Sequence, residues 1–299
     1  MNRSATSPVH GKAVFITGAA RGVGAEVASR LHGNGAKLVL TDLDEAPLND
    51  LAAALGDDRV LTIAADVRDL DAMQSAAAAG VERFGGIDVV VANAGIATYG
   101  SVLHADPEAF KTLIDVNVLG VYYAVRAVLP SVIDRRGYVL IVSSAAAYSA
   151  IPGSASYCAS KAGVEHFANT LRLEVAHLGV DVGSAHMSWI DTPLVRETHE
   201  WASLQEMKSQ MRGPFGKTTS VEKCGEAFVR GIERRKRRIN CPGWVGFVRW
   251  LKPLLSTSVG ESQMLKSVPD LLPKLDTEIA ALGRNMSARI ESLEKKPTT

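Results

Sequence analysis

Short apolar segments alternate with longer helical patterns along the chain from residue 12 onward. Seven of these segments are rich in β-branched residues and predict strands: residues 14–17, 37–40, 60–63, 87–91, 139–142, 180–182 and 238–242. The first, second, fourth and fifth are almost continuously apolar, which is typical of parallel strands covered on both faces. The pattern therefore predicts a parallel sheet buried between two layers of helices.

Helical patterns fill the intervals between these segments, at residues 23–32, 47–55, 70–84, 107–129, 156–177 and 221–237. Glycine follows the first three, and proline begins the second and the fourth, as is typical of helix ends and starts. Repeated strand-helix-strand units favour right-handed crossovers between parallel strands. The sequence accordingly predicts a doubly wound α/β fold of the Rossmann type, with three layers.

A different pattern begins after about residue 187. Residues 188–216 have no strand signal and carry large aromatic and sulfur-containing side chains, namely Trp189, Trp201, Met207, Met211 and Phe215. Residues 243–299 contain helical stretches, which we expect to be broken at Pro253, Pro269 and Pro273 because proline lacks the backbone N–H donor. We therefore expect one α/β domain over residues 9–242 and a helical C-terminal extension over residues 243–299.

Composition narrows the classes of function. The 299 residues carry 33 Lys+Arg and 32 Asp+Glu, a net charge of +1, so no overall field attracts nucleic acid. No run of 18 apolar residues suggests a membrane span, and the first ten residues lack the apolar region of a signal peptide. The three cysteines have no metal-ligand spacing and fit a reducing compartment. We expect a cytoplasmic protein with no metal and no nucleic-acid partner.

A glycine-rich turn joins the first predicted strand to the first helix, where residues 17–24 read Thr-Gly-Ala-Ala-Arg-Gly-Val-Gly. Glycines let the backbone approach a diphosphate closely, and the helix N-terminus supplies free N–H donors. The GxxxGxG spacing differs from the general GxGxxG fingerprint, so the turn alone fits a purely structural role equally well. It becomes more informative together with the residues that follow.

Asp42 stands just after the second predicted strand, 18 residues beyond Gly24. An acid near this position accepts hydrogen bonds from the adenosine ribose of a dinucleotide. Its carboxylate would repel a 2′-phosphate, which favours NAD as the cofactor. Arg21 in the glycine turn is a cation that could meet such a phosphate, and NADP therefore remains the alternative. The structural alternative for Asp42 is a solvated strand end.

Four polar residues further along the chain suggest acid-base chemistry. Tyr157 and Lys161 lie four residues apart in a predicted helix and share one face, and an ammonium beside a tyrosine lowers the pKa of its phenol. Ser144 ends the fifth predicted strand, and Asn117 interrupts an apolar helical stretch. Each also has a structural explanation when taken singly: chance spacing, a strand end, or an amide that satisfies backbone groups.

In this combination the chain resembles the short-chain dehydrogenase/reductase family. The matching pieces, in the family's order over residues 12–195, are the GxxxGxG turn, Asp66-Val67 after the third strand, Asn93-Ala94-Gly95 after the fourth, Asn117, Ser144 and Tyr157-xxx-Lys161. The resemblance implies hydride transfer between a nicotinamide cofactor and a secondary alcohol or ketone. The alternative function is a non-catalytic dinucleotide-binding sensor or scaffold that uses the extension for a partner or a membrane surface.

The resemblance also implies a role for each matching position. Tyr157 would be the general acid or base, with Lys161 lowering its pKa and holding the nicotinamide ribose. Ser144 would orient the reacting oxygen, and Asn117 would support a water that relays protons. The expected cofactor-binding residues are Gly18, Arg21, Gly22, Val23 and Gly24 at the diphosphate, Asp42 at the ribose, Asp66 and Val67 at the adenine, Asn93, Ala94 and Gly95 at the adenosine-side ribose and the central sheet, and Tyr157, Lys161, Ile190 and Thr192 at the nicotinamide.

Two positions depart from the family's pattern. Ala92 replaces the first Asn after the fourth strand, which changes little, and Met187-Ser188 replaces the usual Pro-Gly after the sixth. The second departure alters the turn over the nicotinamide, where the resemblance implies contacts of Ile190 and Thr192 with the carboxamide. In the family the next segment is a lid over the substrate, here about residues 188–216. Its Trp, Met and Phe residues suit a lipophilic substrate or, equally, packing in a core.

The C-terminal part of the sequence also bears on partners. A basic cluster, Arg230, Arg234, Arg235, Lys236, Arg237 and Arg238, precedes an aromatic amphipathic stretch at residues 244–255. This pattern fits peripheral contact with a membrane. We favour the alternative, a basic helix end followed by a tail that packs on the domain. Members of the family commonly form dimers or tetramers through the helices near Asn117 and Tyr157, so the resemblance implies a homodimer or homotetramer.

Overall fold

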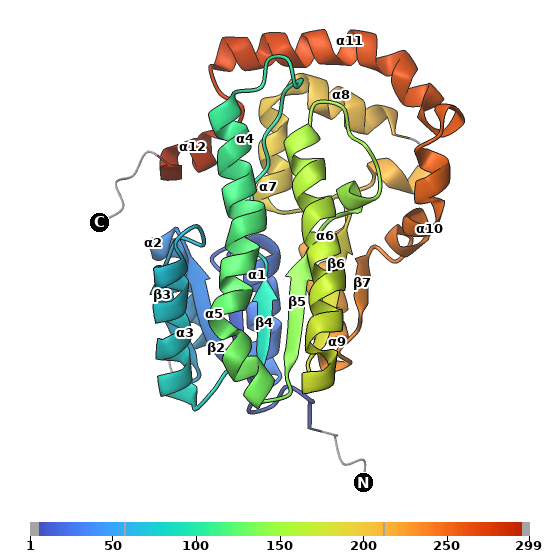
Figure 1. The fold of residues 1–299 in the computed structure, drawn as a ribbon. Coiled ribbons are helices and arrows are strands. Elements are labelled where there is room, and N and C mark those ends of the chain that lie inside the picture. The colour runs from blue at the N-terminus through green and yellow to red at the C-terminus, as the bar shows by residue number, and fades with distance from the viewer. Residues whose placement is uncertain (1–5, 57, 212, 295–299) are drawn as a thin grey trace.

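The computed structural model describes residues 6–56, 58–211 and 213–294. Seven parallel strands form one sheet in the order β3-β2-β1-β4-β5-β6-β7 (Figure 1). They are β1 (Ala13–Thr17), β2 (Lys37–Asp42), β3 (Val60–Ala64), β4 (Val89–Ala92), β5 (Tyr138–Val142), β6 (Asp181–Met187) and β7 (Arg238–Cys241). All seven predicted strands are present, and the predicted doubly wound α/β fold is confirmed.

Helices cover both faces of this sheet (Figure 1). One layer contains α1 (Gly22–Gly33), α2 (Glu45–Leu55) and α9 (Val221–Glu233); the other contains α3 (Leu70–Phe84), α5 (Gly120–Asp134) and α6 (Ala155–Val175). Each layer presents an apolar stripe to the sheet. Leu31 and Phe228 are buried in the first core, and Met73 and Val164 in the second. The two cores fix the strand ends from which the polar side chains project.

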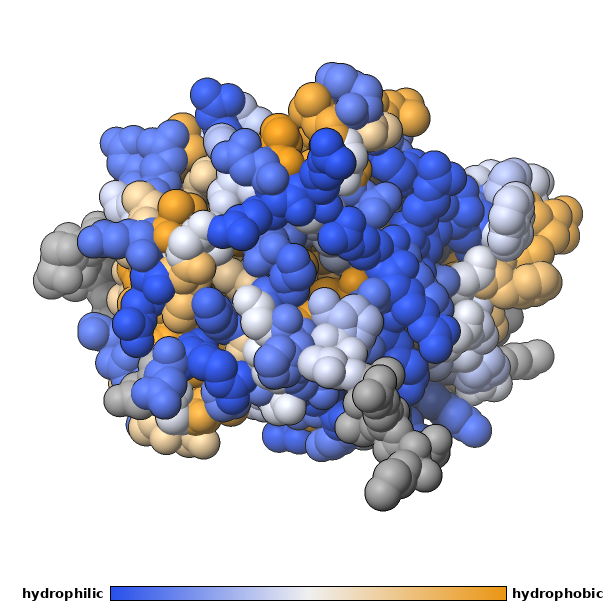
Figure 2. All heavy atoms as spheres, turned by 90° about the horizontal axis from the view of Figure 1, so that it is seen from below, coloured by the Kyte–Doolittle hydropathy of each residue, from blue (hydrophilic) through white to orange (hydrophobic). Residues whose placement is uncertain are grey.

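The strand order reverses between β1 and β4, which are neighbours in the sheet although two strands separate them in sequence. In a doubly wound sheet this reversal opens a crevice at the carboxyl ends of the strands, where ligands bind. In Figure 1 these ends point upward, beneath the C-terminal helices. The opposite end, seen from below in Figure 2, is mostly hydrophilic.

The predicted helix at residues 107–129 is longer and less regular than expected. It consists of α4 (Pro107–Ile114), a π-helical turn (Asp115–Leu119) and α5. By length and composition the whole stretch Pro107–Asp134 could cross a membrane. In this fold it belongs to a helical layer instead, because Leu113 and Val121 are buried in the core beside the sheet.

Short helices follow β6, as the missing strand signal suggested. They are α7 (Pro193–Arg196), a 3₁₀ turn (Glu197–Glu200) and α8 (Ala202–Gln210). The C-terminal extension contributes α10 (Val245–Leu255), α11 (Ser258–Leu282) and α12 (Ala288–Glu294), and residues 295–299 lie outside the described part. In Figure 1, α11 arches over α8, and α12 returns toward the carboxyl ends of the strands.

The prediction that the prolines would break the helices of the extension was wrong. Pro253 lies inside α10, and Pro269 and Pro273 lie inside α11. Proline interrupts the hydrogen bonding of a helix and bends it, but buried apolar contacts can hold the bent helix together. The buried residues Leu275 and Ile279 of α11 provide such contacts by packing with Trp201 and Leu204.

The basic cluster and the aromatic stretch lie at opposite ends of β7. Arg234–Arg237 are exposed in the turn before the strand, whereas α10 follows its carboxyl end. One face of α10 packs on the domain, since Val245 and Val248 are buried with Ala147 and Tyr148. The other face exposes Phe247, Trp250 and Leu254. The cluster and the apolar face therefore do not form one continuous amphipathic surface.

Candidate active site

The glycine turn packs tightly between β1 and α1. Gly18 and Gly22 have positive φ angles of 64° and 56°, a region that favours glycine. A Cβ at Gly18 would lie 2.7 Å from the Cα of Ala94, and one at Gly24 would overlap the Gly18 carbonyl oxygen. No side chain caps the first turn of α1, so its backbone N–H groups remain available to an anion.

Asn93 ties this turn to the end of β4. Its amide Nδ2 donates hydrogen bonds to the carbonyl oxygens of Thr17 (3.0 Å) and Gly18 (2.9 Å). The Thr17 hydroxyl oxygen in return accepts from the backbone N–H groups of Asn93 and Ala94, at 3.1 Å each. Sequence reasoning included Thr17 in the glycine turn but gave it no role of its own; its signal was a polar residue ending an otherwise apolar strand. Asn93 thus holds the turn in shape.

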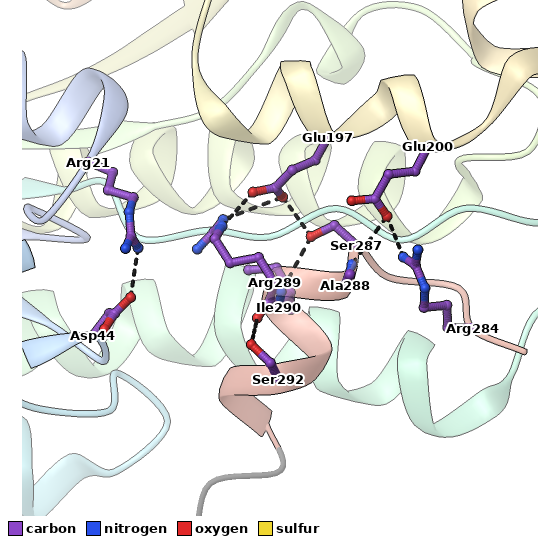
Figure 3. A network of polar contacts seen from close by, with 10 residues as sticks. All are labelled: Arg21, Asp44, Glu197, Glu200, Arg284, Ser287, Ala288, Arg289, Ile290 and Ser292. Atoms are coloured by element: carbon purple, nitrogen blue, oxygen red, sulfur yellow. Dashed lines mark hydrogen bonds and ion pairs between the residues drawn. The ribbon is translucent and has the colours of Figure 1, made fainter. Parts of the chain in front are cut away.

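Asp42 is fixed at the end of β2 beside the glycine turn. Its carboxylate accepts from the backbone N–H of Ala20 at 2.9 Å and from that of Asp44 at 3.1 Å. Arg21 is in an ion pair with Asp44, with Nη1 and Oδ2 2.7 Å apart (Figure 3). Two carboxylates therefore stand at the adenosine end of the predicted site, and the cation of the turn is already engaged by one of them.

Asp66 and Val67 form the neighbouring wall of the same cleft, after β3. The Asp66 carboxylate pairs with the Arg68 guanidinium, with Oδ2 and Nη2 2.6 Å apart. Val67 is buried. This wall therefore combines a charged pair with a buried apolar residue.

The predicted catalytic residues converge where β5 ends and α6 begins. Ser144 caps the 3₁₀ turn after β5; its hydroxyl lies beside Tyr157 and donates to the Met187 carbonyl oxygen at 3.4 Å. The Lys161 Nζ lies 5.7 Å from the centre of the Tyr157 ring and donates to the Val142 carbonyl oxygen at 3.1 Å. All three side chains line the cleft that also contains the glycine turn. The glycine turn and the Tyr157-xxx-Lys161 motif, which are more than 120 residues apart in sequence, thus line the same cleft.

Asn117 lies in the π-helical turn between α4 and α5, a feature that often occurs at functional sites. Its fully buried amide accepts from the Ile96 backbone N–H at 2.8 Å and donates to the Ile96 carbonyl oxygen at 3.0 Å and the Ser160 hydroxyl at 3.1 Å. A Cβ at Gly95 would lie 3.2 Å from the Asn117 Oδ1 and 3.3 Å from the Lys161 Nζ. The amide is therefore a backbone anchor that also lies close to Lys161.

The segment with Met187-Ser188 crosses from β6 to the glycine turn. The Ser188 N–H donates to the Cys241 carbonyl oxygen at 3.0 Å, and Ile190 pairs with Thr219. The buried Thr192 then reaches the turn, since a Cβ at Gly22 would lie 3.2 Å from its Cγ2. Neither Met187 nor Ser188 has a positive φ, so the segment crosses the cleft without the usual proline and glycine.

The comparisons with known proteins agree with this geometry. The sequence profile of the short chain dehydrogenase family matches residues 12–203, about two thirds of the chain. The chain belongs to the short-chain dehydrogenase family. Among its relatives, an uncharacterized NAD-dependent oxidoreductase of Mycobacterium tuberculosis is 36% identical over 204 residues, 62% of this chain and 74% of that protein. The trans-4-hydroxycyclohexanecarboxylate dehydrogenase of Sinomonas cyclohexanicum is 34% identical over 191 residues, 61% of this chain and 74% of that protein.

Solved structures of short-chain dehydrogenases have the same fold. A 3-ketoacyl-(acyl-carrier-protein) reductase from Brucella melitensis, complexed with NADH, superposes with a TM-score of 0.70 at 27% identity. The match covers 97% of that reductase but 78% of this chain. About a fifth of this short-chain dehydrogenase therefore has no counterpart there.

Burial shifts the pKa values of Tyr157 and Lys161 in this short-chain dehydrogenase. It raises the pKa of Tyr157, and the neighbouring Ser144 hydroxyl opposes that rise. It lowers the pKa of Lys161 to about 8, because the ammonium is almost completely removed from water. The pKa of Tyr157 is thus raised, whereas the neighbouring Lys161 alone was expected to lower it. The lysine donates to the Val142 carbonyl, and the raised pKa of Tyr157 favours its protonated form.

A buried polar network behind Ser144 was missed by sequence reasoning. The His186 Nε2 lies 3.0 Å from the Tyr148 hydroxyl and 2.9 Å from the Ser184 hydroxyl, and its Nδ1 lies 3.4 Å from the Ser144 carbonyl oxygen. Burial lowers the pKa of His186 to about 4, so the ring is neutral at physiological pH. The Tyr148 hydroxyl also donates to the Glu165 Oε1 at 3.0 Å, which extends the network to a buried carboxylate. The only signal was a lone histidine in a strand, which usually indicates core packing.

The site fits a dinucleotide without a metal ligand set. Glycines line the cleft where a Cβ would close the turn. Among residues 6–56, 58–211 and 213–294, no three His, Cys, Asp or Glu side chains are grouped to hold a metal ion. The free N–H groups of α1 and the anchored Asp42 suit the diphosphate and the ribose of such a cofactor.

Proposed function

We propose that this short-chain dehydrogenase transfers hydride between NAD and a secondary alcohol or ketone, with Tyr157 as the general acid or base. The observation that carries the proposal is that Tyr157, Ser144 and Lys161 lie next to one another in the same cleft as the glycine turn. A dinucleotide-binding sensor or scaffold, the alternative function, requires none of this acid-base geometry.

The residues of the cleft account for the proton in this reaction. The bound nicotinamide supplies or accepts the hydride. In reduction, the hydroxyls of Ser144 and Tyr157 hold the carbonyl oxygen, and Tyr157 gives its proton to that oxygen as the carbonyl carbon receives the hydride. The neighbouring Lys161 stabilises the phenolate left behind. Oxidation runs through the same positions in reverse, so the phenolate takes the alcohol proton.

The adenosine end supports NAD over NADP. Asp42 and Asp44 place two carboxylates there, and Arg21 is held in an ion pair with Asp44. The Asp42 carboxylate would repel the 2′-phosphate of NADP. Arg21 would not offset this repulsion, because it is already paired with Asp44. The names of the Mycobacterium tuberculosis relative and the NADH complex of the Brucella melitensis reductase support the same choice.

Asp42→Asn tests this choice, because it removes the charge and keeps the acceptor that anchors Ala20. We expect NAD to bind about tenfold more weakly and NADP to bind more tightly than to the wild type. Titration of the fluorescence of NADH and NADPH measures both affinities. A wild-type protein that binds NADPH more tightly than NADH would contradict the assignment.

The substrate end favours an apolar alcohol or ketone. Met187, Leu194 and Val195 line the cleft together with Ser144 and Tyr157. Trp201 of the predicted lid does not support an apolar substrate, because it is buried in the core formed with α11. A screen of alcohols and ketones by cofactor fluorescence, with sterols, terpenoids and medium-chain alcohols included, tests the proposal. Turnover of charged substrates alone would refute the apolar preference.

A homodimer or homotetramer fits the helices around the site. Leu119 and Tyr122 are exposed at the start of α5, and Leu173 is exposed on α6. Such apolar residues on neighbouring helices suit burial against a second copy. Light scattering coupled to gel filtration gives the oligomeric state directly. The expected cytoplasmic location stays a prediction.

A further inference from the structure

The C-terminal extension supplies one wall of the cofactor cleft. Arg289, Ile290 and Leu293 of α12 line it together with the glycine turn and with Asp66 and Val67. Ile290 is only 6% exposed and belongs to the same buried cluster as Val67. The helix is therefore anchored in the core next to the predicted adenine site, more than 220 residues from it in sequence.

Ion pairs fasten this segment to the predicted substrate lid (Figure 3). Glu197, in the 3₁₀ turn after α7, accepts from the Arg289 guanidinium and, at 2.6 Å, from the Ser287 hydroxyl. Glu200, one turn further on, pairs with Arg284 and accepts from the Ala288 N–H at 3.2 Å. The four charged side chains are partly buried, with exposed fractions from 14% to 31%. These contacts, which we call the latch, join the two segments that border the cleft.

The latch places a cation opposite the glycine turn. In Figure 3 Arg289 and Arg21 lie on facing sides, and both line the cleft. Glu197 engages the Nε and Nη2 of Arg289, but a guanidinium has five N–H donors in a planar fork. It can therefore keep its carboxylate partner and still donate to a second anion, as suits the diphosphate of a dinucleotide.

We propose that residues 284–293 form a strap over the bound dinucleotide. Arg289 donates to the diphosphate, Ile290 and Leu293 cover the adenosine half, and the latch sets how fast the cofactor leaves. This proposal rests on the proposed function, because it takes NAD as the ligand. It assigns a binding role to the C-terminal extension, which lies beyond residues 12–203 matched by the family profile.

Dissociation of NADH from the full-length protein tests the strap. Stopped-flow fluorescence gives the dissociation rate, and titration gives the affinity. We expect Arg289→Gln to raise both the rate and the dissociation constant about tenfold, since one charge-assisted contact is lost. Glu200→Gln, which loosens the latch without altering a residue that lines the cleft, is expected to raise the rate by a smaller factor. Lys274→Gln is the matched control, because it breaks an exposed ion pair between α11 and Glu206 of α8, and neither residue lines the cleft.

Hydrogen exchange of residues 284–293 with and without NADH gives a second readout, in which the strap slows exchange when the cofactor is bound. A wild-type protein that does not bind NADH would refute the proposed function. NADH binding with neither slower exchange nor faster release from Arg289→Gln would overturn the strap and leave the proposed function intact. If Arg289→Gln does not fold, Arg289→Lys replaces it as the test variant, because it keeps the charge but loses the planar fork. The strap then requires Arg289→Lys to release NADH faster than the wild type, by less than the tenfold expected for Arg289→Gln.

Discussion

Replacing Tyr157 by Phe is expected to lower kcat about a thousandfold while NADH still binds. The substitution removes only the hydroxyl that Ser144 contacts, and with it the proton donor for the substrate oxygen. General acid-base catalysis typically contributes a factor of about 10² to 10⁴. A loss of about a thousandfold lies in the middle of this range.

The measurement needs a cofactor readout that does not depend on turnover. Fluorescence titration of NADH checks that the cleft is intact, and steady-state kinetics on any substrate found in the screen gives kcat. Cys158→Ala is the matched control, since it changes the adjacent side chain, whose thiol pKa is raised by burial. It is expected to leave kcat within about twofold. Unchanged turnover in Tyr157→Phe would remove the proposed chemistry and favour the sensor or scaffold.

The strands and the cleft could be predicted because their signals are local. Each strand is a short apolar run, and polar residues such as Asp42 and Ser144 mark where the runs end. The topology of a parallel sheet then brings all carboxyl ends to one edge. The spacing of Tyr157 and Lys161 likewise needs only the helical repeat. These inferences required no knowledge of distant contacts.

The C-terminal part could not be predicted in the same way. The α11 helix continues past Pro269 and Pro273 because Leu275 and Ile279 pack on Trp201, a partner about 75 residues away. The contact of Arg289 with Glu197 spans 92 residues and leaves no periodic pattern. Local propensity gives the wrong helix ends here, since tertiary packing outweighs the missing N–H donors.

The buried network behind Ser144 shows a related limit. His186 contacts Tyr148 and Ser184, which come from different elements, and only the folded chain reveals that the three meet. The direction of the Tyr157 pKa shift could not be predicted for a similar reason. A sequence shows the neighbouring Lys161, but the extent of burial decides the net direction. Where electrostatics and desolvation oppose each other, the outcome depends on side-chain exposure that a sequence does not contain.

Replacing Lys161 by Met is expected to abolish measurable turnover and, at the same time, to stabilise the protein without cofactor. Burial lowers the pKa of this lysine from 10.5 to about 8, so holding its charge at pH 7 costs about 3 kcal/mol of folding free energy. Methionine has a similar length and no charge. After about 1 kcal/mol for the lost hydrogen bond to Val142, a net gain of about 2 kcal/mol remains.

The pH dependence identifies the cause of this gain. Because the folded lysine has the lower pKa, the unfolded chain binds more protons between pH 8 and 10.5, and the lysine's contribution to stability rises with pH in that window. The wild type should therefore recover about 1 kcal/mol relative to Lys161→Met between pH 7 and pH 9. Urea unfolding followed by circular dichroism at both values measures the difference, with Lys223→Met at an exposed position of α9 as the control. A Lys161→Met protein that is less stable than the wild type at both pH values would show that the charge of Lys161 is compensated by its surroundings.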